Sequence, residues 1–450
     1  MSRGFVPPHP PRDVKPALPW SGLFGERART AVYGWSEKAF TEPHIRREVF
    51  GFTVHIPLDP DAIQRVFQTN AANYAKPDIA KRLAGPLIGR GLLMADGGLW
   101  RKQRRIVAAN FTPPAVDGLI PAFAGAAQDE AAGWAPGERD MAAAATRATM
   151  RIIADTLFGG DPRLKTPEAM RHIANALAAG GAARVSAILR LPDIGWSPTL
   201  RRGRKGQLFL RKTLADLVRE RAAGEPQDDF LGSLIAALTQ QFGRDEGLQL
   251  AVDNAATFYL AGHETTANAV SWALFLLSEQ PVWQDRAAAE AAAALAEGGD
   301  DADLPERLPL LRQVLDETLR LYPSAPRFDR QAIEADALGE HAIAPGDIIS
   351  IWPWLLHRHK SLWDDPDAFD PERFGPGGEK QRHRFQYFPF GGGPRTCVGA
   401  HFARVEALAI LAYWLAGWRF TPVPGHEVET SGSVTLRPKD GLPLRIEHRD

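Results

Sequence analysis

The feature that most constrains this chain is its single cysteine, Cys397, among 450 residues. Three glycines, Gly391 to Gly393, precede it and allow the backbone to turn tightly and to approach a flat object closely. Residues 398–415 carry apolar side chains three and four positions apart, which predicts a helix. A thiol just before a helix N-terminus faces unpaired N–H groups and the positive end of the helix dipole, and both favour the thiolate. The pattern therefore indicates a protein that presents one anionic sulfur ligand to a metal.

A lone cysteine more often packs as a small hydrophobic side chain than it binds a metal. Here Phe390, Gly393, Arg395 and Gly399 stand at fixed offsets from Cys397, as Phe-x-x-Gly-x-Arg-x-Cys-x-Gly. This arrangement resembles the haem-binding signature of the cytochrome P450 family. The resemblance implies that Cys397 is the axial ligand of a haem b iron, that Phe390 packs against sulfur and ring, and that Arg395 pairs with a haem propionate. It adds further cofactor-binding residues in the same loop: Pro389, Gly391 and Gly399.

Composition limits the class of protein. The chain has 53 Lys and Arg against 54 Asp and Glu, a net charge of −1, so electrostatics favour neither nucleic acid nor a membrane surface as a partner. A single cysteine excludes an intrachain disulfide and a multi-cysteine metal site, and suits a reducing cytoplasm. The N-terminus lacks the apolar stretch of a secretory signal, and the longest apolar runs fall short of the roughly 20 residues that span a bilayer. We predict a cytoplasmic protein without a membrane anchor, similar to the bacterial-type members of the family.

The predicted architecture is mainly α-helical with a smaller β-rich region, which the resemblance implies is a cytochrome P450 fold around one buried haem. Residues 1–30 are rich in proline and predict an irregular N-terminal extension, and residues 31–450 predict a single catalytic domain. Three hairpins are expected, near Gly51, around Pro345-Gly346, and at an Asp440-Gly441 turn.

A second element resembling the family is a predicted helix with Trp100 and Arg104 on one face. Taken alone, it is explained equally well as an amphipathic helix with a solvated basic face. In the family, Trp-x-x-x-Arg at this point hydrogen-bonds a haem propionate, a charge-assisted contact. Three neighbouring cations would then face an acidic electron-transfer partner of the ferredoxin type: Arg101, Lys102 and Arg105.

A long helix is predicted from about residue 248 to 279, with a glycine inside it. Gly262 costs about 1 kcal/mol relative to alanine, which suggests close approach or a kink. Ala261-Gly262-x-Glu264-Thr265 resembles the oxygen-activation motif of the family. The resemblance implies that Ala261 and Gly262 lie beside the haem and that Glu264 and Thr265 deliver protons for the activation of O2. Ordinary hydrogen bonding of a threonine to its own helix backbone is the alternative.

Glu317 and Arg320 lie three apart on a helix predicted for residues 309–321. Such a pair is usually a surface ion pair worth roughly 0.2–0.5 kcal/mol. With the later Pro-Glu-Arg373-Phe it resembles the structural network of the family, in which Arg373 joins Glu317 and Arg320 in the core. The resemblance also suggests that Arg330 binds a propionate.

By resemblance, a substrate pocket is formed by the 80–93 loop and by Phe258, Ala325, Arg327, Phe328 and Val434, below a mobile lid at residues 175–200. Its mainly apolar lining suggests a hydrophobic substrate such as a terpenoid, fatty acid, steroid or aromatic compound. Arg327 is unusual there, and either anchors a substrate carboxylate or points to solvent.

The function implied is that of a haem-thiolate monooxygenase. It would insert one atom of O2 into a hydrophobic small molecule, with electrons from NAD(P)H delivered by a separate ferredoxin and ferredoxin reductase. A haem-thiolate peroxygenase or isomerase, which needs no external electrons, and a non-catalytic haem sensor are the alternatives. The intact Glu264–Thr265 pair argues against both.

Overall fold

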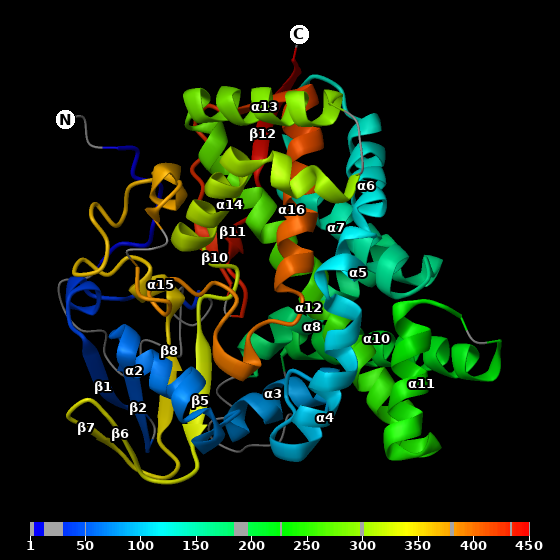
Figure 1. Ribbon diagram of the computed structural model, residues 1–450, viewed down its shortest axis with the longest axis vertical. Helices are drawn as coiled ribbons and strands as arrows, with labels where there is room; N and C mark the ends of the chain where they lie inside the picture. Colours follow the sequence, from blue (N-terminus) through cyan, green and yellow to red (C-terminus); the bar gives the residue numbers. More distant parts are fainter. Residues whose placement is uncertain are drawn as a thin grey trace.

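The computed structural model describes residues 4–12, 30–49, 51–183, 197–225, 227–297, 301–378, 382–432 and 434–449. Helices fill most of the molecule in Figure 1, and the blue and yellow strands of the main sheet gather at one corner. The α-helices of the described chain are α2 (Pro60–Gln64), α3 (Asp78–Ile88), α4 (Gly97–Ala108), α5 (Pro113–Asp117), α6 (Ile120–Ala132), α7 (Met141–Leu157), α8 (Pro167–Ala182), α10 (Pro198–Ala223), α11 (Phe230–Phe242), α12 (Arg244–Ser278), α13 (Pro281–Ala296), α14 (Pro309–Leu321), α15 (Pro353–Leu356) and α16 (Ala400–Gly417). The strands are β1 (His44–Val49), β2 (Phe52–Pro57), β3 (Tyr74–Ala75), β4 (Gly137–Asp140), β5 (Phe328–Ala332), β6 (Asp336–Leu338), β7 (His341–Ile343), β8 (Ile348–Ile351), β9 (Trp418–Pro422), β10 (Thr430–Ser431), β11 (Arg437–Pro438) and β12 (Pro443–His448).

The central element is α12, which is buried along most of its length. Asp245 and Glu246 in its first turn complement the positive end of the helix dipole. Beyond them most of its residues are apolar or small on all sides, as expected of a helix surrounded by others. It packs against α7, α10, α11, α14 and α16. The predicted long helix is thus confirmed, with its start four residues earlier.

Two helices that carry motifs also match their predictions. The helix after Cys397 is α16, which packs on α6, α12 and α13. The helix that carries Glu317 and Arg320 is α14, whose first residue, Pro309, needs no hydrogen-bond partner for its nitrogen.

The largest sheet has the strand order β1-β2-β8-β5-β3. β1 and β2 form the predicted hairpin, and Gly51 at its turn has φ +80°, which favours glycine. β5 runs antiparallel to β8 with Arg330 opposite Ile349. This pairing fixes the segment that carries Phe328 and Arg330.

The other two predicted hairpins are wrong in their pairing. β7 pairs with β6, whereas β8 crosses to the main sheet, so no hairpin forms around Pro345-Gly346. Asp440 and Gly441 do form a turn with positive φ, but β11 pairs with β10 and β12 pairs with β4 and β9. Local residues set a turn, while the partner of each strand depends on burial in the whole fold. The predicted 80–93 loop is likewise helical through Ile88, in α3.

The described part of the proline-rich N-terminal stretch packs onto the rest of the chain. Phe5 accepts a hydrogen bond from the Phe369 N–H (2.9 Å), and Pro8 accepts one from the Tyr322 hydroxyl (2.6 Å). Half of the predicted lid, residues 184–196, lies outside the described residues. Among the residues that are described, no helix is both long and apolar enough to cross a membrane.

Candidate active site

The loop before Cys397 is closed by backbone hydrogen bonds. The Cys397 N–H donates to the Phe390 carbonyl oxygen (2.9 Å). Gly393 has φ +66°, and a Cβ added there would lie 1.7 Å from the carbonyl oxygen of Phe67. The glycine requirement is therefore real, but the close neighbour of Gly393 is a protein backbone, which the sequence analysis did not anticipate.

The side chain of Cys397 is exposed, although protein atoms surround it closely enough for desolvation to matter. Burial raises the pKa of the Cys397 thiol, while the Gly399 N–H and the positive charge of Arg104 oppose this rise. The Gly399 N–H at the start of the helix thus lowers the pKa of the thiol, as the sequence analysis expects, while burial raises it by more. A coordinated metal ion would deprotonate the thiol.

The oxygen-activation motif lies where α12 is least covered. Ala261 is exposed and Glu264 and Thr265 are half-buried, although the turns on both sides, 250–260 and 266–278, are buried. Exposure in the middle of a core helix, together with the exposed Cys397, is what an interior cofactor site requires. A Cβ on Gly262 would lie 2.5 Å from Ile153 Cδ1, so close packing against α7 explains this glycine.

The acid and the alcohol of this turn already have partners. Thr265 Oγ1 donates to the Ala261 carbonyl oxygen (2.9 Å), the backbone bond that the alternative interpretation expects. Glu264 Oε1 accepts a hydrogen bond from Thr435 Oγ1 (2.9 Å) and lies 3.8 Å from a guanidinium nitrogen of Arg437. Ser324 Oγ donates to the Thr265 carbonyl oxygen (2.8 Å), which places the segment after α14 beside this turn.

Trp100 and Arg104 lie on α4, as predicted, and Arg395 stacks above Trp100 with 4.5 Å between the guanidinium carbon and the ring centroid. Arg395 also pairs with Asp96 (2.5 Å), a residue that the sequence analysis missed. Asp96 lies four residues before Trp100 and adjoins the first turn of α4. The head group of Arg104 has no hydrogen bond or ion pair within the described ranges.

A surplus of positive charge lies around Arg395. Burial, and then repulsion by Arg330 and Arg395, lower the pKa of Lys76 to about 7. Burial and Arg395 lower the pKa of Arg330 to about 10. Lys76 was also missed, since no periodicity or motif marks it, and its ammonium group has no hydrogen-bond or ion-pair partner among the residues that the structure describes.

We call these four residues the cation group: Lys76, Arg104, Arg330 and Arg395. The nearby carboxylates do not balance it, because Asp96 also pairs with Lys81 (2.8 Å) and Asp329 also pairs with Arg327 (3.0 Å). Arg330 is buried and the other three cations are half-buried, and a surplus of cations shielded from water is unfavourable unless anions join it. The residues present therefore fit a cofactor with carboxylate groups, such as haem.

The predicted structural network is present. Arg320 and Glu317 are fully buried and paired through two short contacts, 2.6 Å and 2.7 Å. Arg320 further donates to the carbonyl oxygens of His357, Pro366 and Ala368. Arg373 Nε lies 3.6 Å from Glu317 Oε1.

The candidate pocket residues divide. A Cβ on Gly391 would touch the Phe328 ring at 3.7 Å, so Phe328 lies against the Cys397 loop. Phe258 is buried against the rings of Phe111 and Phe230, a packing that does not support the prediction that it lines a pocket.

Arg327 pairs with Asp329 and lies over the Trp352 ring (5.2 Å), so its charge is met within the protein, which neither alternative foresaw. Ala325 is half-buried and Val434 is 61% exposed. On the outer face of α4, Arg101, Lys102 and Arg105 are exposed, as a docking surface requires.

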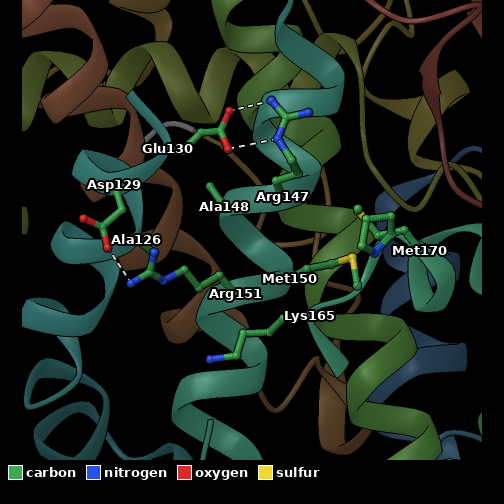
Figure 2. A pocket seen from close by; sticks show the side chains of 10 residues that line it. Ala126, Asp129, Glu130, Arg147, Ala148, Met150, Arg151, Lys165 and Met170 are labelled. Atoms are coloured by element: carbon green, nitrogen blue, oxygen red, sulfur yellow. Dashed lines mark hydrogen bonds and ion pairs between the residues drawn. The ribbon is translucent and has the colours of Figure 1, made fainter. Parts of the chain in front are cut away.

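A separate hollow of about 380 Å³ lies along α6 and α7 (Figure 2). Its charged side chains pair with acidic neighbours: Arg147 with Glu130 (2.5 Å), Arg151 with Asp129, and Lys165 with Asp155 (2.5 Å). None of the predicted site residues lines it. The hollow therefore has no part in the candidate active site.

Comparison with known proteins identifies the family of the chain. The family described as Cytochrome P450 matches residues 16–443. Cyclooctatin synthase of Streptomyces melanosporofaciens is 32% identical over 396 residues, 85% of this chain and 84% of that protein. The 11-oxo-beta-amyrin 30-oxidase of Glycyrrhiza uralensis is 29% identical over 412 residues, 86% of this chain and 77% of the relative.

The crystal structure of the cytochrome P450DA heme domain has the same fold, with a TM-score of 0.82 at 23% identity, over 99% of this chain and 98% of that one. The predicted mainly helical P450 fold is thereby confirmed. The chain belongs to the cytochrome P450 family, as a haem-dependent monooxygenase.

Proposed function

We propose that this enzyme inserts one oxygen atom of O2 into a C–H or C=C bond of a hydrophobic small molecule, with electrons from a separate donor. The observation that carries the proposal is the exposed turn of α12 with the acid–alcohol pair Glu264 and Thr265, in an otherwise buried helix. Haem, held by Cys397, supplies the redox chemistry when bound.

The chain's own part is to handle protons. Glu264 lies 3.8 Å from Arg437, whose side chain is 48% exposed, and it precedes Thr265 on α12. In the proposed role, Glu264 takes up protons from the surface side and Thr265 hands them on at the site. The Thr265 hydroxyl donates its hydrogen bond to the Ala261 carbonyl oxygen, and its own oxygen can still accept a hydrogen bond from another group. A general acid must lie within hydrogen-bond reach of the group that it protonates, so Thr265 would turn its hydrogen from Ala261 toward the site.

Binding of the cofactor falls to the cation group, with the Trp100 indole N–H beside it. These cations would donate charge-assisted hydrogen bonds to the two haem carboxylates, and Arg395 would bind one of these carboxylates in place of Asp96. Phe390, Pro389 and the glycines of the loop would support the ring and the sulfur.

We propose that the electron donor is an acidic protein of the ferredoxin type that docks at Arg101, Lys102 and Arg105, with NAD(P)H oxidised by its reductase. The three cations are exposed on one helix, which supports electrostatic steering. A cytoplasmic location suits a protein with one cysteine.

The substrate class is narrowed by one relative. The name of the 11-oxo-beta-amyrin 30-oxidase states oxidation of an amyrin, which favours a terpenoid among the hydrophobic classes considered. Phe328, close to Gly391, supplies an apolar wall beside the loop.

The first test is the absorption spectrum of the reduced protein with carbon monoxide. A strongly red-shifted Soret band is expected from the wild type and not from Cys397→Ser. Product should then form with ferredoxin, reductase and NADPH, and not with peroxide alone. Turnover with peroxide alone would instead support the peroxygenase, and haem binding without turnover would support the sensor.

A further inference from the structure

The segment 387–390, just before the glycines, is held by side chains to which no role has yet been given. His357 is fully buried, and its Nε2 accepts a hydrogen bond from the Phe388 N–H (3.1 Å). The carbonyl oxygen of His357 accepts from Arg320 (2.8 Å). Through His357, the buried pair at Arg320 is connected to the backbone of the Cys397 loop.

The surroundings of His357 keep its ring in the form that can accept this hydrogen bond. Burial, and the charges of Arg320 and Arg358, hold the pKa of His357 well below its ordinary value. The imidazole is therefore neutral, and acceptance at Nε2 places its proton on Nδ1.

A second contact holds the same segment from α14. The Tyr387 hydroxyl donates to Asp316 Oδ1 (3.0 Å), and Arg404 of α16 lies 2.6 Å from the same oxygen. The Arg404 guanidinium also covers the Phe390 ring at 5.1 Å. Phe390 in turn accepts the hydrogen bond of the Cys397 N–H.

We infer that His357 is a positioning residue for the metal ligand, and that Asp316 assists it through Tyr387 and Arg404. His357 fixes the backbone at Phe388, so that Phe390 and Cys397 follow at the right place for the sulfur to bind iron. The inference rests on the proposed haem-thiolate function. It concerns side chains outside the Glu317, Arg320 and Arg373 network.

The test compares His357→Leu with His357→Gln, which retains an acceptor. The probe is carbon monoxide bound to the reduced, haem-loaded protein, with the red-shifted band followed over time in mild urea. For His357→Leu we expect the band to convert to the shorter-wavelength form about tenfold faster, as loss of the partner of one buried N–H implies. Glutamine should restore part of the difference.

The matched control is Gln284→Leu. Gln284 is also buried and also bonds backbone groups, those of Leu277 and Phe420, but it lies on α13. Its loss should lower the unfolding midpoint without faster conversion of the band. Equal conversion in Gln284→Leu, or a band in His357→Leu as stable as that of the wild type, would overturn the inference.

If His357→Leu yields no folded protein, Tyr387→Phe decides the question. It removes the contact with Asp316 and keeps the ring, so a smaller acceleration of the same kind is expected. An unchanged band in Tyr387→Phe then refutes the inference. A wild type without any red-shifted band would instead refute the proposed function itself.

Discussion

Two charged regions of this enzyme, one fully buried and one mostly half-buried, are built differently. At Glu317 and Arg320, both carboxylate oxygens and all three guanidinium nitrogens have partners within the protein. In the cation group, the head groups of Lys76 and Arg104 have no partner anywhere in the described segments. In the first region the protein itself supplies every partner. In the second region an anionic ligand would supply the partners that the protein lacks. The unpaired head groups of Lys76 and Arg104 are thus what the proposed binding of haem carboxylates requires.

The largest effect on stability is expected when the network of Glu317 and Arg320 loses one of its charges. Glu317→Gln leaves the guanidinium of Arg320 buried without its counter-charge, and we expect a loss of about 3–5 kcal/mol in the free energy of unfolding. Urea unfolding of the haem-loaded protein measures it. Arg373→Lys, at the partly exposed edge, should cost less than about 1 kcal/mol. Similar losses in both variants would show that the network is not closed around Glu317.

Substitutions in the cation group should change the rate at which haem leaves the protein. In Arg104→Leu, we expect haem to pass to an excess of an acceptor protein at least about tenfold faster, because a charge-assisted bond to a carboxylate is lost. Lys76→Met should act in the same direction. Arg105→Leu, on the exposed face of the same helix, is the control and should release haem at the wild-type rate. Unchanged release in Arg104→Leu would remove this residue from the cofactor site.

Thr265 belongs to neither region, since its hydroxyl has a backbone partner and still faces the site. Thr265→Ala should retain haem and substrate binding but reduce the product formed per NAD(P)H by about tenfold, with peroxide as the by-product. Parallel measurement of product, peroxide and NAD(P)H tests this. Thr266→Ala is the neighbouring control, because its buried hydroxyl bonds the Gly262 carbonyl oxygen. Unchanged coupling in Thr265→Ala would exclude the proton-delivery role.

A third polar cluster, formed by His44 and His55 of the main sheet with His341 of β7, is expected to give the smallest effect. His44 Nε2 lies 3.0 Å from His55 Nδ1, and the His44 ring stacks on His341 at 3.8 Å. Burial, and then the charges of His341 and His55, lower the pKa of His44 to about 4. As the pH falls, His44 is therefore protonated in the unfolded chain before it is protonated in the folded chain. The stability that neutral His44 provides is complete above about pH 6.5 and is lost as the pH falls toward 4.

Allowing for solvent screening, we expect His44 to contribute about 1 kcal/mol to this loss. Unfolding curves at several pH values should show a shallower fall in His44→Gln than in the wild type. Identical pH slopes would show that His44 titrates alike in the folded and unfolded chains.

The sequence by itself determined the features that depend on near neighbours. A spacing of three placed Glu317 and Arg320 on one face of α14, and apolar periodicity marked the helix after Cys397 and most of α12. Turn residues marked Gly51 and Asp440-Gly441. The offsets around Cys397 sufficed for the family, since that loop is local and its glycines are required by the backbone at Gly393.

Tertiary structure alone decided which distant groups meet. β8 and β12 pair with strands other than their sequence neighbours, Asp96 and Lys76 lie beside Arg395, and Phe258 packs in an aromatic cluster. Gly393 approaches Phe67, and His357 reaches Phe388, only because separate elements are packed together. Such contacts depend on how the whole chain packs, because the elements compete for the same buried surfaces. No local sequence pattern specifies which distant groups will meet.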